Sequence, residues 1–269
     1  MKYIPGKHGC TNRCCRDNPC VNGGVCQDVC DPYSIRFNCT CPDTHTGRRC
    51  EKNKHPRTCY DLARYGASTS GKYLIFDSVE QGFPVFCDME SESGFVWTLI
   101  QSFSLANNAL FRNEPFGADF PVNQEDNYVN WNAYRLSLPQ MESLANHSTH
   151  LRAICNYPRE GLQYTDYARA KLKGHDIFGT WDFTCRMYEY INIRGIECSN
   201  CTALTKQLPG QAWTINSYRR HLNCTFDGTL GTTSNEQNFG RYLPLNNNHS
   251  CSSSLNSTTQ HWFGVKRDL

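Results

Sequence analysis

The chain has 269 residues, a formal net charge of +2 and 17 cysteines. Basic and acidic residues are nearly balanced and form no block of like charge, so there is no electrostatic reason to expect nucleic acid or an anionic membrane as a partner. No run approaches the roughly 18 apolar residues that a membrane-spanning helix needs. We therefore expect no membrane span in this chain.

The cysteines gather at the amino-terminal end. Nine of them lie in the first 50 residues, which marks a boundary near Glu51: Cys10, Cys14, Cys15, Cys20, Cys26, Cys30, Cys39, Cys41 and Cys50. A segment of about 40 residues is too short for an adequate hydrophobic core, and a reducing cytosol rarely tolerates so many paired thiols. The sequence therefore predicts a secreted protein, or one on the extracellular face of the cell surface. Residues 1–9 lack the apolar region of a signal peptide, so we expect a mature or truncated form.

Potential glycosylation sites agree with an extracellular location. Six asparagines stand in Asn-X-Ser/Thr sequons: Asn38, Asn146, Asn200, Asn223, Asn248 and Asn256. Such sequons accept N-linked glycans in secreted proteins. Asn38, Asn200 and Asn223 each directly precede a cysteine, where a neighbouring disulfide could hinder the transferase.

Residues 10–51 form a module with regular cysteine spacing. From Cys15 the pattern is C-x4-C-x5-C, followed by C-x-C and C-x8-C, with Asn22-Gly23-Gly24 before the third cysteine. This pattern resembles the EGF-like family, and the resemblance implies a small disulfide-rich β module. Six cysteines alone allow fifteen pairings, so the pairing comes from the resemblance: Cys15 with Cys26, Cys20 with Cys39, and Cys41 with Cys50. No acidic pair precedes the module, so we expect no calcium there.

Three cysteines of this region fall outside the EGF-like pattern, namely Cys10, Cys14 and Cys30. Cys30 could pair with Cys10 or Cys14, and Cys14 could replace Cys15 as the first cysteine. Because the total is odd, at least one thiol stays out of intrachain pairing. It either bridges to another chain or lost its partner with a truncated amino terminus.

Residues 52–57 are polar, contain Pro56 and are typical of a linker. Beyond them, 58–66 predicts a short helix ending at a glycine, and 71–76, 83–90 and 94–101 predict strands. These segments resemble the opening of the fibrinogen C-terminal-like domain through Cys59, Gly71, Tyr73, Phe86-Cys87-Asp88-Met89, Gly94, Trp97, Thr98, Ile100 and Gln101. The resemblance implies an α+β, mostly β domain over 58–269 and a Cys59–Cys87 bridge. The likeness is closer over 58–157, where 130–144 shows helical spacing, and 158–269 diverges.

The divergent part leaves the metal site and several bridges open. Fibrinogen-like lectins hold calcium in an Asp-x-Asp loop, which this chain lacks. The nearest set of hard oxygen donors is Asp227, Asn235, Glu236 and Asn238, so calcium is possible there and no other cofactor is expected. We expect Cys224 to pair with Cys251 around this loop. Cys198 and Cys201 form a structural bridge, either locally or to Cys185 or Cys155.

No catalytic motif is present, and we expect no enzyme activity. Asp176 and Asp182 flank the aromatic patch 177–181, which predicts a strand rather than an acid-base pair. The polar tail 246–260 predicts a solvated surface loop, with hydrogen bonding to sugar hydroxyls as the alternative. We therefore expect extracellular binding of a glycan or protein in adhesion or lectin-like recognition. The alternative is a structural matrix or filament subunit that assembles as a homo-oligomer through spare cysteines.

Overall fold

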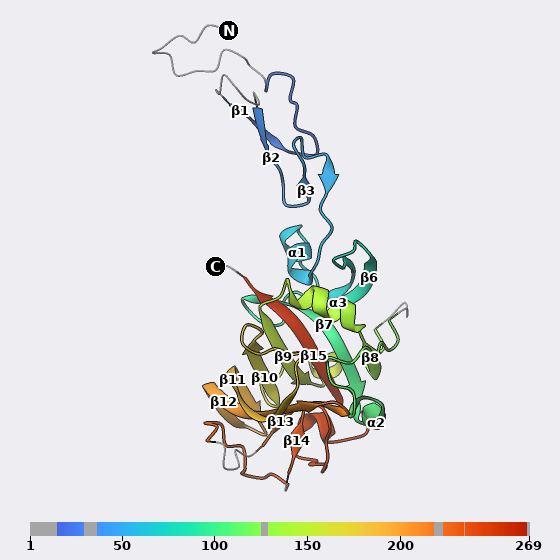
Figure 1. Cartoon of the computed structure of the whole chain (residues 1–269), viewed down its shortest axis with the longest axis vertical. Coiled ribbons are helices and arrows are strands. Elements are labelled where there is room, and N and C mark those ends of the chain that lie inside the picture. Colours follow the sequence, from blue (N-terminus) through green and yellow to red (C-terminus); the bar gives the residue numbers. More distant parts are fainter. Residues whose placement is uncertain (1–14, 30–36, 125–128, 218–222, 234, 268–269) are drawn as a thin grey trace. The chain divides into compact units, whose positions relative to one another are not determined.

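A computed structural model describes residues 15–29, 37–124, 129–217, 223–233 and 235–267 of the chain. The chain divides into two compact units, residues 1–56 and residues 57–269. Figure 1 labels their helices and strands. The division falls inside the segment 52–57 that the sequence assigns to a linker.

The amino-terminal unit contains two short antiparallel sheets. β1 (Val25–Asp28) pairs with β2 (Phe37–Thr40), and β3 (His45–Thr46) pairs with β4 (Lys52–Asn53). β4 lies within the expected linker, so the linker is shorter than the sequence predicts.

Disulfides hold this unit together. They are the three pairs implied by the EGF-like resemblance: Cys15–Cys26, Cys20–Cys39 and Cys41–Cys50. Among the described residues of this unit, only Cys20 and Cys50 are buried, so crosslinks take the place of a hydrophobic core. Cys10, Cys14 and Cys30 lie outside the described residues, and their pairing stays a prediction.

The larger unit is built on one sheet of 11 strands. In spatial order the strands are β14 (Gln237–Asn238), β13 (Gln211–Asn216), β12 (Ile196–Leu208), β11 (Trp181–Ile193), β10 (Tyr167–Lys171), β9 (His150–Cys155), β15 (Thr258–Lys266), β7 (Phe95–Ser104), β6 (Gly82–Asp88) and β5 (Gly71–Phe76), with β8 (Ala133–Arg135) beside β7. The last strand, β15, lies between β7 and β9 and runs antiparallel to both (Figure 1). This mostly β architecture confirms the predicted fold class.

Short helices accompany the sheet in the described residues: α1 (Cys59–Arg64), α2 (Asn108–Phe111), α3 (Leu138–Ala145) and α4 (Tyr157–Glu160), with 3-10 turns η1 (Leu105–Asn107) and η2 (Ser250–Ser252). α1 begins at a capping box, in which the Asp61 amide donates to Thr58 Oγ1 (3.2 Å) and the Thr58 amide donates to the Asp61 carboxylate (3.0 Å). It ends before Gly66, whose φ of 102° is a left-handed conformation that favours glycine.

A buried arginine organises the centre of the core. The Arg152 guanidinium is fully buried, with its carbon 4.7 Å from the Trp97 and Trp262 ring centroids. It pairs with Asp88 (2.8 Å) and Glu92 (3.3 Å), which compensate its charge in a site closed to solvent. Burial alone would raise the pKa of Asp88, but Arg152 and hydrogen bonds from Ser91 lower it below its ordinary value. We call Arg152, Asp88, Glu92 and the two indoles the Arg152 cluster.

Two predictions about the middle of the chain are wrong in part. The segment 130–144 shows helical spacing, but its first part contains strand β8, and α3 begins only at Leu138 after the Ser137 cap. The aromatic patch 177–181 was expected to be a strand. Residues 177–180 instead form a turn before β11, where Ile177 is buried and Trp181 begins the strand.

The predicted Cys224–Cys251 bridge is also wrong. The structure pairs Cys155 with Cys251 and Cys185 with Cys224. Because β9 and β15 are antiparallel neighbours, the end of β9 at Cys155 meets the segment just before β15. The segment after Cys224 instead runs beside β12, since the Phe226 amide donates to the Thr202 carbonyl (2.9 Å). The expected Cys59–Cys87 bridge is present, and Cys198 pairs locally with Cys201.

Candidate functional site

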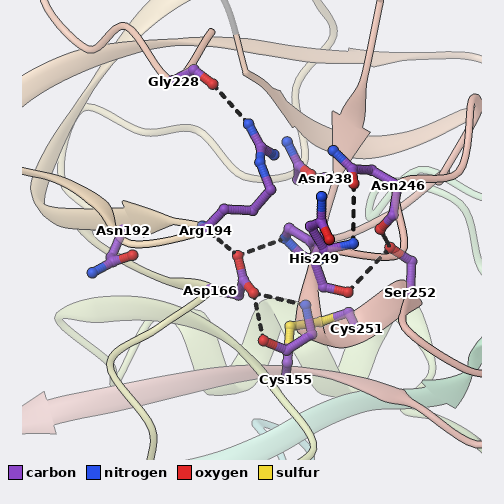
Figure 2. A network of polar contacts seen from close by, with 12 residues as sticks. Cys155, Asp166, Asn192, Arg194, Gly228, Asn238, Asn246, His249, Cys251 and Ser252 are labelled. Atoms are coloured by element: carbon purple, nitrogen blue, oxygen red, sulfur yellow. Dashed lines mark hydrogen bonds and ion pairs between the residues drawn. A yellow bond between two sulfur atoms is a disulfide. The ribbon is translucent and has the colours of Figure 1, made fainter. Parts of the chain in front are cut away.

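The loop proposed for calcium is occupied by an arginine side chain of the protein itself. Arg194 stands with Gly195 in the two-residue turn between β11 and β12, and both residues have positive φ values (54° and 80°). Its guanidinium pairs with the Glu236 carboxylate and donates to the Gly228 carbonyl (2.7 Å), as Figure 2 shows in part. The oxygens of this loop therefore already face a cation, the guanidinium of Arg194.

The four residues named for calcium are not free to bind it together. Glu236 and Asn238 are buried, and the Asn238 amide donates to Ser217 Oγ (2.8 Å). Asp227 is exposed, and its carboxylate accepts from the Thr229 hydroxyl (2.7 Å). Glu236 would be the best carboxylate ligand for calcium, but its side chain is paired with Arg194. Asn235 is an exposed loop residue.

A second set of buried polar groups ties the carboxyl-terminal loop to this arginine (Figure 2). Asp166 accepts from the Arg194 amide (2.8 Å) and the Ser250 amide (2.7 Å), and His249 Nε2 lies 3.4 Å from the same carboxylate. Asn246 donates to Glu236 (2.8 Å). We call these residues, with Arg194 and Glu236, the Arg194 network.

The Arg194 network is structural. His249 and Asp166 have no exposed side-chain surface, so a substrate cannot reach them. Burial lowers the pKa of His249 below its ordinary value, although Asp166 and Glu236 oppose this shift, so the imidazole is neutral. The described residues contain one group of three metal-ligating side chains within 4.8 Å, namely Cys155, His249 and Cys251. Its two sulfurs are joined in a disulfide and offer no thiolate.

The polar tail 246–260 is only in part the solvated loop that the sequence predicts, since residues 247–248 and 253–256 are exposed. Asn246, His249 and Ser252 are buried, and 257–260 enter strand β15 in the sheet centre. The polar side chains are tolerated inside because they bond to one another, as when Ser252 Oγ donates to the Asn246 carbonyl (2.7 Å).

A surface groove offers a better site for a ligand. It has a volume of about 550 Å³ and lies where β10, β11 and β12 meet the ends of β7 and β15. Its lining residues are Phe95, Tyr164, Arg169, Glu189, Tyr190, Ser199, Asn200 and Lys266. We call it the tyrosine groove.

Aromatic rings give this groove its apolar surface. Tyr164 is 46% exposed, and its centroid lies 6.0 Å from that of Tyr190 in an edge-on arrangement. Tyr167 supports Tyr164 from below at 5.1 Å and is itself fully buried. The Tyr190 hydroxyl donates to Glu197 (2.7 Å), which fixes the ring. The groove thus presents a held, half-exposed aromatic face.

A charged pair stands beside the rings. Arg169 Nε donates to Glu189 (3.1 Å), and its guanidinium lies 4.6 Å from the Phe95 ring centroid. Arg169 also pairs with buried Glu92, which connects the groove to the Arg152 cluster. Burial would raise the pKa of Glu189, but His150 and Arg169 lower it below its ordinary value, so the carboxylate is charged. Held hydrogen-bonding groups beside aromatic surface are typical of small-ligand sites.

The sequence did not single out any of these groove residues except Asn200, which was named for its sequon. They come from five strands and one loop, and no local spacing connects them. A weak signal was available in the density of Tyr between 157 and 190. The carboxylates that drew attention, Asp176 and Asp182, lie elsewhere, and Asp182 pairs with Lys206 (3.3 Å).

All six sequon asparagines are exposed: Asn38, Asn146, Asn200, Asn223, Asn248 and Asn256. Their glycosylation stays a prediction. No helix among the described residues is long and apolar enough to cross a membrane.

Comparisons with known proteins match different relatives to different parts of the chain. Residues 55–114 match the family model of the fibrinogen beta and gamma chains, C-terminal globular domain. Human ficolin-3 is 30% identical over 105 residues, which are 38% of this chain and 28% of ficolin-3. The fibrinogen-like globe domain of human ANGPTL2 is a structural neighbour at 21% identity and a TM-score of 0.29, covering 43% of this chain and 49% of that one.

Other relatives are similar over a length close to that of the EGF-like module. The dog protein named hepatocyte growth factor activator serine proteases is 45% identical over 51 residues, which are 19% of this chain and 7% of that protein. Human protein jagged-2 is 44% identical over 50 residues, which are 19% of this chain and 4% of jagged-2. The chain thus spans less than a third of each of these curated relatives.

Proposed function

We propose that this extracellular recognition protein binds carbohydrate in the tyrosine groove. The proposal starts from its architecture, an EGF-like module joined to a fibrinogen-like domain. The observation that carries the proposal is the half-exposed Tyr164 ring, held against Tyr190 beside the Arg169–Glu189 pair. Flat aromatic faces pack against the C–H faces of sugars, while charged groups at the edge accept and donate hydrogen bonds to hydroxyls. The module then serves as a spacer that carries the binding domain.

A glycan array probed with the whole chain tests this proposal. We expect signals on a restricted set of glycans, unchanged by a calcium chelator because Arg194 occupies the candidate calcium loop. Tyr164→Ala should weaken the signals by about tenfold, equivalent to about 1.4 kcal/mol. Tyr164→Phe keeps the ring and should bind like the parent. Silence across the array, or equal binding by Tyr164→Ala, would sink the carbohydrate proposal.

The odd cysteine count supports a second candidate, a covalently assembled matrix subunit. The described bridges use fourteen of the 17 cysteines. The other three are Cys10, Cys14 and Cys30. At most two of them can pair with each other, so at least one thiol has no partner within the chain. A non-reducing gel should then show a covalent dimer or larger species that disappears with reductant. A monomer with a free thiol would count against assembly through cysteines.

A further inference from the structure

A second, smaller pocket adjoins the tyrosine groove. It has a volume of about 160 Å³ and shares two lining residues with the groove, Glu189 and Asn200. Its other walls include Lys171, Lys173 and His175. A water molecule occupies about 30 Å³ in the liquid, so the pocket has room for a carboxylate or sulfate group. We call it the lysine pocket.

Cations exceed carboxylates around the two cavities. The lining includes four cationic side chains, Arg169, Lys171, Lys173 and Lys266, and one carboxylate, Glu189. That carboxylate already faces Arg169 (3.1 Å), Lys171 (3.6 Å) and His150 (3.3 Å). Lys173 and Lys266 are exposed, so the surface keeps a positive excess.

One histidine lines the lysine pocket. His175 is 2% exposed, and its Nε2 has no hydrogen-bond partner among the described residues. Burial, followed by the charge of Arg186, lowers the pKa of His175 to about 4, so the ring is neutral at physiological pH and adds no charge to the pocket. The guanidinium of Arg186 also lies beside this pocket, because it donates to the Gly174 carbonyl (3.4 Å).

We propose that the groove takes an acidic glycan, whose sugar ring packs on Tyr164 while its carboxylate or sulfate enters the lysine pocket. This inference rests on the proposed carbohydrate binding. An anion there would meet the ammonium groups of Lys171 and Lys173, which are suitable partners for charge-assisted hydrogen bonds. A neutral glycan would leave the lysines without a counter-charge and gain only the contacts of the groove.

The test compares glycans that differ in one group. An array of the same lactosamine chains in neutral, sialylated and sulfated forms is probed with the whole protein. We expect the acidic forms to bind at least about tenfold more strongly, and a rise in ionic strength from about 0.01 M to about 0.15 M to reduce this advantage. Preference for the sialylated or the sulfated form identifies carboxylate or sulfate as the ligand group.

Variants then separate the pocket from the groove. Lys171→Gln with Lys173→Gln should lower the binding of the acidic forms to the level of the neutral forms. Lys52→Gln with Lys54→Gln makes the same charge change at exposed positions of the amino-terminal unit and should not change the preference for acidic forms. Circular dichroism checks that each variant is folded.

Each outcome decides between the two proposals. Equal binding of neutral and acidic forms, or an unaltered preference in the double lysine variant, overturns the acidic-glycan inference while carbohydrate binding stands. Silence on every glycan overturns the proposed function and the inference with it.

Discussion

In the amino-terminal unit, disulfides hold strands of two to four residues, and two half-cystines are its only buried side chains among those described. The larger unit has four disulfides of its own, but it also buries a continuous core in which Trp97, Arg152 and Trp262 are fully enclosed. One unit is held chiefly by crosslinks that restrict its unfolded chain, and the other chiefly by packing and compensated charge. Mutations in the two units should therefore lower the stability of the protein in different ways.

The largest effect should come from the Arg152 cluster. Arg152→Met removes the cation that compensates buried Asp88 and Glu92, and we expect it to lower the free energy of unfolding by about 3–5 kcal/mol. Denaturant titration followed by tryptophan fluorescence measures this. Arg64→Met, at an exposed position of α1, should cost less than about 0.5 kcal/mol. Adding Asp88→Asn and Glu92→Gln to Arg152→Met should restore part of the loss, and no restoration would contradict the charge argument.

The Arg194 network should give a similar or slightly smaller effect. Arg194→Met leaves Glu236 buried without its partner, and we expect a loss of about 3 kcal/mol. A calcium chelator should leave the melting temperature of the parent protein unchanged. A fall in melting temperature with chelator, reversed by added calcium, would show that a metal holds the loop after all.

Breaking a crosslink should affect the module alone. Cys20→Ser with Cys39→Ser should destabilise it by about 2–4 kcal/mol, because its strands have no core to replace the bridge. Limited proteolysis should then cut within residues 15–56, while the tryptophan transition of the larger unit stays the same. Persistent protease resistance of the module would mean that the two remaining bridges suffice.

The smallest effect should come from lowering the pH by one unit in mild acid, through two buried histidines of the larger unit. Burial lowers the pKa of His175 to about 4 and of His261 to about 3, from a usual 6.5. Between pH 6.5 and 4 these rings protonate only in the unfolded chain, so the unfolded state gains protons and stability falls as the pH falls. The loss approaches about 1.4 kcal/mol per pH unit for each ring.

The control for this pH effect is His175→Gln, which should flatten the slope of stability against pH in that window. Denaturant titrations at several pH values provide the measurement. An unchanged slope would mean that the pKa of His175 is the same in the folded and the unfolded chain.

Local patterns were enough to predict the module and the start of the larger unit. The cysteine spacing implied three bridges, and the strands near Tyr73, Phe86 and Trp97 were located to within a few residues. The failures involved partners far apart in sequence. The loop 227–238 has the composition of a calcium site, and nothing near it indicates that Arg194 fills it. Likewise, the pairing of Cys251 with Cys155 depends on β15 returning beside β9.

The Cys155–Cys251 bridge has a consequence for how this protein can change. It closes a loop across 96 positions. That loop starts at the end of β9, contains β10 to β14 of the same sheet, and ends just before β15, the strand next to β9. The tyrosine groove belongs largely to this loop, through β10, β11 and β12. A protease cut inside it would leave both fragments covalently attached to the sheet centre. Insertions and residue exchanges within this loop likewise leave both of its ends joined at the Cys155–Cys251 bridge. Binding specificity can therefore diverge in evolution while the strands that carry the groove are kept.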